Sequence, residues 1–289
     1  MKVLDGICAG AGMMLLLGGA SVASAQDSMG AMPPPKVLVI EREYLKPGRD
    51  AAHIKTESAF VSTFKAAKSP THYLALDAMS GQPRMLFLEG YPTFEEWEKE
   101  NKAFDANKAL TAQIGKVAET DGEHLASEDQ GVYVYDPDLS LHDGDVVHKR
   151  YFEITGFHVK PGHRAEFVEL AKLYKEGFAG FPNANWALFQ GYYGAPSGDY
   201  YLAISAMTSL AEDDASMNDD KKLADAMGPA KMKRLEELAA SCIESTGTNL
   251  FRFDPDLTYA DDSWIKADPF WKPKSVQMTA KKPAATAAQ

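Results

Sequence analysis

The chain has 289 residues, of which 45% are hydrophobic and 25% are charged, and its formal net charge is -11. This apolar content is enough for packed cores and excludes a wholly disordered chain. The acidity argues against nucleic acid as a partner, because phosphate binding needs clustered Lys and Arg. Two cysteines exclude a disulfide-stapled scaffold. The length favours two domains of about 100–150 residues.

Residues 1–25 are typical of a signal peptide. Lys2 precedes an apolar stretch centred on Met13–Leu17, and the small residues Ala23-Ser24-Ala25 form a cleavage site before Gln26. An uncleaved anchor is the alternative, but the apolar stretch is shorter than the roughly 20 residues that span a bilayer. We therefore expect cleavage, a secreted or periplasmic location, and no integral membrane segment in the mature chain.

The next residues predict a Pro-rich linker and then one module of strands and helices. Alternating and β-branched runs predict strands, a Pro-Gly turn starts a first helix, and a longer helical region precedes the last strand. The linker is 26–35 and the module is 36–140, with strands at 37–45, 71–78, 84–90 and 131–135 and helices at 48–65 and 93 to about 123.

Residues 141–258 predict a second module with the same order. Its first helix is amphipathic, and its long helical region is interrupted by Gly228-Pro229. The strands are 151–159, 185–193, 200–207 and 248–253, and the helices are 162–178 and 210 to about 243. A C-terminal tail, 259–289, follows. Its apolar residues Trp264, Phe270 and Trp271 suit docking on the body, and beyond 272 its composition predicts disorder.

Two turns occur once in each module. Lys46-Pro47-Gly48 returns as Lys160-Pro161-Gly162, which is 114 positions later (46 to 160), and Asp136-Pro137-Asp138-Leu139 returns as Asp254-Pro255-Asp256-Leu257, 118 positions later (136 to 254). Matches at both ends of a hundred-residue unit, in the same order, predict a tandem duplication.

The order β-α-β-β-α-β in each module predicts an α+β fold of the ferredoxin-like type. In the first strand, Leu38, Ile40, Arg42 and Tyr44 share one face, and Val37, Val39, Glu41, Glu43 and Leu45 share the other. Both faces are therefore partly apolar. The two modules can bury the second face of each sheet by forming one intramolecular α+β barrel.

With this element order, the Lys-Pro-Gly turns and the duplication, residues 36–258 resemble the dimeric α+β barrel superfamily. The antibiotic-biosynthesis-monooxygenase-like and NIPSNAP-like branches are the most similar. The resemblance implies a fold, and it leaves the activity open among cofactor-free oxygenases, haem-binding or haem-degrading proteins, dismutases and proteins without a known activity. No residue pattern assigns one branch, so no site residue is carried over.

Candidate site residues come from the predicted sheets. Aligning the modules pairs His72-Tyr73 with Asn185-Trp186, and Tyr44 with His158. A polar group beside an aromatic ring can orient a planar ligand in an apolar pocket. His72 and His158 are the candidate catalytic bases, and Tyr44, Tyr73, Asn185 and Trp186 are the candidate ligand-binding residues.

No metal site and no cofactor are predicted. The segment from His142 to His148 contains two histidines and two aspartates, but it lies between the modules, where Asp and Gly are ordinary linker residues. Haem is the alternative cofactor, with His158 or His72 as its axial ligand.

The sequence leaves three hypotheses about function. The leading one is an exported barrel protein that binds a small molecule and acts as a cofactor-free oxygenase on a planar or aromatic compound. The second is a non-catalytic ligand-binding, haem-binding or stress-related protein. The third is a barrel that mediates only assembly, for example as a homo-oligomer. The expected partner in the first two hypotheses is a small-molecule ligand.

Overall fold

The computed structural model describes residues 33–142, 144–217 and 219–273. The predicted signal peptide, most of the Pro-rich linker and residues 274–289 of the tail lie outside these ranges. Predictions of cleavage and of a disordered tail end therefore remain predictions.

The first module contains four strands and three helices. The long helical region expected after the third strand is two helices, because Asn107 ends one and caps the next by accepting a hydrogen bond from Leu110 N at 3.2 Å. The elements are β1 (Val37–Leu45), α1 (Asp50–Ala67), β2 (Tyr73–Ala78), β3 (Arg84–Tyr91), α2 (Phe94–Ala106), α3 (Lys108–Gly122) and β4 (Leu125–Tyr135).

The second module repeats this order. Its long helix α6 is kinked at Gly228, directly before Pro229, as the sequence predicts. Gly228 has a φ of 74° and a ψ of 167°, which are not helical values. The elements are β5 (Tyr151–Val159), α4 (Arg164–Phe178), β6 (Ala187–Tyr193), β7 (Asp199–Met207), α5 (Ala211–Ser216), α6 (Asp219–Cys242) and β8 (Ile243–Phe253).

The last strand of each module is longer than predicted. β4 begins at Leu125 and β8 begins at Ile243, about six and five residues before the expected starts. These additional residues are mostly polar and exposed, yet they pair with residues 41–45 of β1 and 156–159 of β5. Their side chains face water, so the hydrophobic alternation that reveals a strand is missing there.

The eight strands form one closed antiparallel barrel with the order β1-β3-β2-β8-β5-β7-β6-β4. The two modules join where β2 pairs with β8 and where β4 pairs with β6. The registers of the modules correspond: Tyr44 pairs with Arg84 in the first, and His158 pairs with Tyr200 in the second. The predicted α+β fold, with two ferredoxin-like modules closing a single barrel within one chain, is confirmed.

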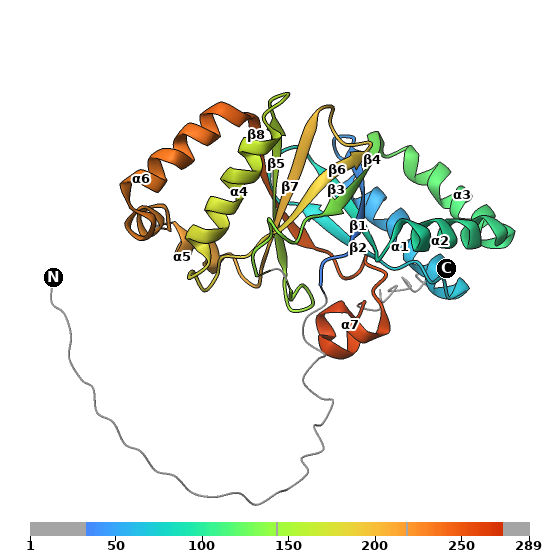
Figure 1. Cartoon of the computed structure of the whole chain (residues 1–289). Coiled ribbons are helices and arrows are strands. Elements are labelled where there is room, and N and C mark those ends of the chain that lie inside the picture. Colours follow the sequence, from blue (N-terminus) through green and yellow to red (C-terminus); the bar gives the residue numbers. More distant parts are fainter. Residues whose placement is uncertain (1–32, 143, 218, 274–289) are drawn as a thin grey trace, which may run out of the picture.

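Helices cover the barrel on two opposite sides. Helices α1, α2 and α3 pack on the first module, and α4, α5 and α6 pack on the second (Figure 1). Alternate strand residues such as Leu38 and Ile40 fill the barrel interior, whereas Val37 and Val39 face the helices. Each strand therefore contributes to an interior core and to a core under the helices.

The C-terminal segment packs below the barrel. Helix α7 (Asp262–Ala267) and the 3-10 turn Pro269–Trp271 lie beneath the strands (Figure 1). The Trp271 side chain is fully buried, and its Nε1 donates a hydrogen bond to the Val147 carbonyl at 2.7 Å. The expected docking of these aromatic residues is what the structure shows. Among the described residues, no helix has both the length and the apolar character needed to cross a bilayer.

Candidate ligand-binding site

A cavity of about 840 Å³ opens at the end of the barrel where β1, β2, β5 and β6 begin. Its inner wall is aliphatic and aromatic, because the strand positions that face the barrel interior are apolar at this end. Cavities with apolar walls and a few polar groups are the usual binding sites for small organic ligands. The inner wall is formed by Leu38, Leu74, Leu88, Phe152, Ala187, Phe189, Ile204 and Ala206.

His72 is the histidine at the rim whose ring is held most firmly. Its Nδ1 lies 3.2 Å from the Tyr259 carbonyl, and its ring stacks on the Tyr259 ring with centroids 4.7 Å apart. A carbonyl only accepts, so Nδ1 carries the proton and Nε2 carries the lone pair. Nε2 lies 3.6 Å from an Asp261 carboxylate oxygen. The rim therefore presents the unprotonated Nε2 of an imidazole beside a carboxylate.

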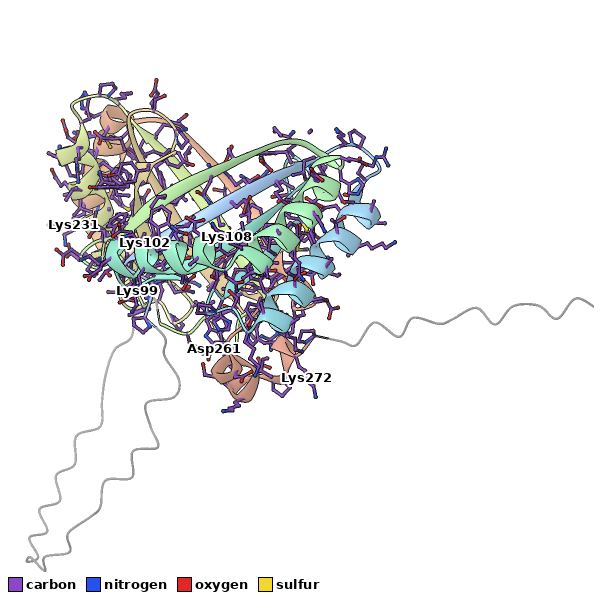
Figure 2. The ribbon with its side chains drawn as sticks, turned by 90° about the vertical axis from the view of Figure 1, so that its right-hand side faces the viewer. Lys99, Lys102, Lys108, Lys231, Asp261 and Lys272 are labelled. Carbon is purple, nitrogen blue, oxygen red and sulfur yellow. The ribbon has the colours of Figure 1, made fainter. Side chains whose placement is uncertain are left out.

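Asp261 comes from the docked C-terminal segment. It lies at the lower end of the barrel, near the cavity mouth (Figure 2). Hydrogen bonds from Ser263, and in addition the neighbouring His72, lower the pKa of the Asp261 carboxyl group. The site is thus completed by residues far from His72 in the sequence.

Asn185 lines the cavity but its amide group is already used. Its Oδ1 accepts from Ala206 N at 2.9 Å, and its Nδ2 donates to Ala206 O at 3.2 Å. Asn185 therefore continues the strand pairing of β7 at the cavity edge. It shapes the wall and keeps little hydrogen-bonding capacity for a ligand.

Tyr44 and His158 lie at the other end of the barrel interior. The Arg84 guanidinium is 5.9 Å from the centre of the Tyr44 ring, and the His158 ring contacts the Tyr200 ring at 4.7 Å. Burial lowers the pKa of Arg84 and raises that of Tyr200. These polar side chains lie at the opposite end of the barrel interior from the cavity.

Tyr73 and Trp186 point to the helix side of the sheet. The Tyr73 ring packs against Phe64 and Phe87, although the residue also contributes to the cavity lining. Trp186 donates from Nε1 to the Leu139 carbonyl at 2.8 Å. Of the six candidates, the structure brings His72, Tyr73 and Asn185 to one cavity, and it places Tyr44, His158 and Trp186 elsewhere.

The cavity residues do not fit a haem group. The inner wall offers no side chain that ligates iron, and the only cavity histidines among the described residues, His72 and His142, lie at the rim. The His72 Nε2 atom that would have to ligate iron lies instead beside the Asp261 carboxylate. His158 lies at the opposite end of the interior. We therefore derive no chemistry through haem.

Sequence reasoning missed a group of ionisable side chains on the helix side of the first module. Glu43, His53, Glu57 and Asp121 are all buried there. Two signals were available. His53 and Glu57 have the i, i+4 spacing of one helix face, and Glu43 lies on a strand face shared with Val37 and Val39. Neither signal shows that strand and helix bring these residues together.

Comparisons with known proteins support the fold. No protein-family model matches the sequence, and no curated protein matches it. An anthrone oxidase-like protein has a similar structure with a TM-score of 0.50 at 14% identity, covering 78% of this chain and 94% of that one.

Two further solved structures have lower scores. A monooxygenase candidate from Lactobacillus acidophilus has a TM-score of 0.46 at 10% identity over 75% of this chain and 93% of its own. A mutant chlorite dismutase from Candidatus Nitrospira defluvii, solved with cyanide, has a TM-score of 0.46 at 9% identity. The match covers 77% of this chain and 92% of that one. At 14% identity, the likeness to the anthrone oxidase-like protein concerns the fold alone.

Proposed function

We propose that this protein binds a planar, largely apolar small molecule in the barrel cavity. The observation that supports this proposal is the cavity itself. Its volume is about 840 Å³, its inner wall is apolar, and its polar groups are confined to the rim. Such a wall removes the ring faces of the ligand from water, while the rim fixes its one or two polar atoms.

We further propose that the chemistry is oxidation of an anthrone-type compound by O2 without a cofactor. His72 Nε2 removes a proton from the ring CH2 group, and Asp261 stabilises the imidazolium that results. The conjugated carbanion then passes its electrons to O2. One oxygen atom becomes the new carbonyl of the quinone and the other leaves as water, so that CH2 and O2 give C=O and H2O.

The competing function is binding without chemistry. It is favoured by the absence of ionisable side chains from the inner wall, within the described residues, so that only the rim can act on a ligand. We also propose that the chain is exported through residues 1–25 and that its two modules arose by tandem duplication, which the matching strand registers support.

Fluorescence titration with an anthrone and with the corresponding quinone tests binding, because Trp264 borders the cavity. Ala206→Phe fills the cavity wall, and we expect it to weaken binding at least tenfold. Ala126→Phe, at an exposed position of β4, is the matched control and should bind like the wild type. Equal binding by both variants would show that the ligand lies outside the cavity.

Oxygen uptake separates catalysis from binding. The proposed oxidation consumes one O2 for each quinone formed, and His72→Ala should reduce turnover by about 10²–10⁴-fold, the usual contribution of a general base. The same variant should retain most of the affinity. Tight binding with no oxygen uptake by the wild type would contradict the oxidase and favour the non-catalytic protein.

A further inference from the structure

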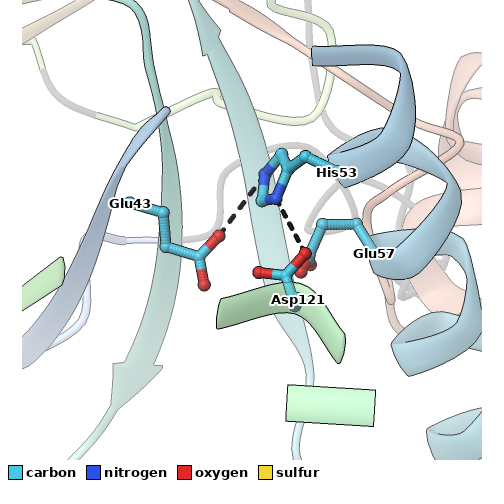
Figure 3. Close-up of side chains that lie close together, drawn as sticks. All are labelled: Glu43, His53, Glu57 and Asp121. Carbon is cyan, nitrogen blue, oxygen red and sulfur yellow. Dashed lines mark hydrogen bonds and ion pairs between the residues drawn. The ribbon is translucent and has the colours of Figure 1, made fainter. Parts of the chain in front are cut away.

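Four ionisable side chains are buried together between β1, α1 and α3, on the side of the barrel wall away from the cavity. Figure 3 shows Glu43 from the strand, His53 and Glu57 from the first helix, and Asp121 from the third, pointing toward one another. Their exposed fractions are 6%, 0%, 3% and 2%. Groups of this type are almost never buried unless they are paired or bind a metal.

The hydrogen bonds of the cluster leave three atoms without partners. His53 Nδ1 lies 2.9 Å from Asp121 Oδ1, at hydrogen-bonding distance. Nε2 lies 3.4 Å from Glu43 Oε2 without the geometry of a hydrogen bond. His53 Nε2, Glu43 Oε2 and Glu57 Oε1 are buried and have no hydrogen-bond partner. Buried polar atoms are rarely left in this state.

Within residues 33–142, 144–217 and 219–273, the cluster is not paired with a fixed positive charge. Among the described residues, no lysine or arginine forms an ion pair with Glu43, Glu57 or Asp121, and His53 is the ionic partner of Glu43 and of Asp121. A cation from outside the chain would compensate these carboxylates and give the unpartnered atoms a partner.

The second module shows that the fold does not require these residues. The offset of 114 places Phe157 where the first module has Glu43, and it places Phe167 where the first module has His53. The centroids of the Phe157 and Phe167 rings are 5.7 Å apart. The same offset relates Glu57 to Ala171, and the offset of 118 relates Asp121 to Ala239. An ordinary apolar core fills this place in the second module.

We propose that Glu43, His53, Glu57 and Asp121 bind one divalent first-row transition-metal ion, such as Mn²⁺ or Zn²⁺. One ligand atom from each residue lies within 4.8 Å of all the others. Tetrahedral ligands about 2.1 Å from an ion are about 3.4 Å apart, so small side-chain rotations close the site. An imidazole with carboxylates suits these ions better than Mg²⁺ or Ca²⁺, which prefer oxygen ligands alone.

The ion would join the helix layer to the sheet. In the metal-free protein the bond between Asp121 and His53 Nδ1 holds these two side chains together, and it is exchanged for bonds to the ion when the site is filled. All four residues are buried, so the site is closed and structural rather than catalytic. It is independent of the cavity, and its presence does not depend on the proposed oxidase activity.

Metal titration of the full protein tests the site. After treatment with a chelator and dialysis, calorimetry with Mn²⁺ or with Zn²⁺ should give one ion per chain, and thermal unfolding should move to higher temperature with either ion. A wild-type protein that binds neither ion and unfolds at the same temperature with and without them overturns the proposal, whatever its variants do.

Two variants locate the ion. Glu57→Gln keeps the shape of the side chain but removes its charge, and we expect it to weaken metal binding at least tenfold. His148→Ala is the matched control, since it removes an exposed histidine that pairs with Asp145 at 3.1 Å, and its metal affinity should equal that of the wild type. Unchanged affinity in Glu57→Gln would place the ion elsewhere and overturn the assignment.

A third variant remains informative if the first does not fold. Replacing the four residues by their counterparts, as Glu43→Phe, His53→Phe, Glu57→Ala and Asp121→Ala, gives the first module the apolar set of the second. We expect this protein to unfold at the same temperature with and without Mn²⁺ and to bind no ion. Retention of one tightly bound ion by this variant overturns the proposal.

Discussion

The two modules have the same strands and registers, but the space between helices and sheet is filled in opposite ways. In the second module Phe167 is buried beside Phe157 and Leu170, in a cluster of apolar side chains. In the first module the equivalent place holds His53, with carboxylates around it. One backbone arrangement therefore accepts both an apolar core and a polar one.

The difference shows what the fold itself requires. An apolar core gains free energy from burial, about 25 cal/mol for each Å² of apolar surface. Buried carboxylates lose hydration, and replacing buried charges by apolar residues is often neutral or stabilising. The four ionisable residues of the first module are thus not needed for folding. Their presence is explained if a bound ion compensates their charge.

The largest expected effect comes from moving one residue of the first module into the second. Phe167→His places an imidazole where the counterparts of the three carboxylates are Phe157, Ala171 and Ala239. We expect it to lower the free energy of unfolding by roughly 3 kcal/mol, as an unpaired polar group in a core does. Urea unfolding measures the change, and Phe167→Leu is the control for lost ring contacts. If Phe167→His lowers the free energy of unfolding no more than Phe167→Leu does, the core of the second module accepts a buried imidazole.

A smaller effect, counted per pH unit, is the pH dependence of the metal-free protein. The raised pKa values, about 9 for Glu43 and about 10 for Glu57 against an ordinary 4.5, mean that the folded chain holds more protons than the unfolded chain between about pH 5 and 9. Stability should therefore fall as pH rises through this window, by about 1.4 kcal/mol per pH unit for each net proton. Groups facing the pair from the packed elements include Glu41, His53, Asp121 and Glu128.

Chemical unfolding in the presence of a chelator, between pH 6 and 8, measures this slope. The protein carrying the four apolar counterparts is the control and should show a much flatter profile, because the titrating carboxylates are gone. Equal slopes in the two proteins would mean that the cluster is not the source of the pH dependence.

The smallest effect is expected for charges that the second module keeps in water. Arg234 on α6 donates to both carboxylate oxygens of Glu169 on α4, at 2.7 and 2.8 Å, but the pair is exposed. Solvent screens such pairs, so Glu169→Gln should leave the unfolding midpoint unchanged within error. A clear decrease in the thermal midpoint would contradict the contrast between buried and exposed charges in the two modules.

Much of the fold could be predicted because its signals are local. The bounds of β1 and β5 were predicted to the residue, and the Gly228-Pro229 interruption was correctly expected within α6. The candidate site could be predicted only in part. His72 and Asn185 lie at the cavity, but His158 has the same strand-face signal and lies at the other end of the barrel.

By itself the sequence determined most of the elements, the two modules and which residues of each strand share a face, because hydrophobic alternation and Pro-Gly turns act over a few residues. Only the tertiary structure decided which residues meet. His72 meets Asp261 because β2 pairs with β8 and the C-terminal segment folds back beneath the barrel. His53 meets Asp121, 68 positions away, because α1 and α3 lie on the same sheet face. Such contacts arise from closure of the barrel and packing of its helices, and neither leaves a local pattern in the chain.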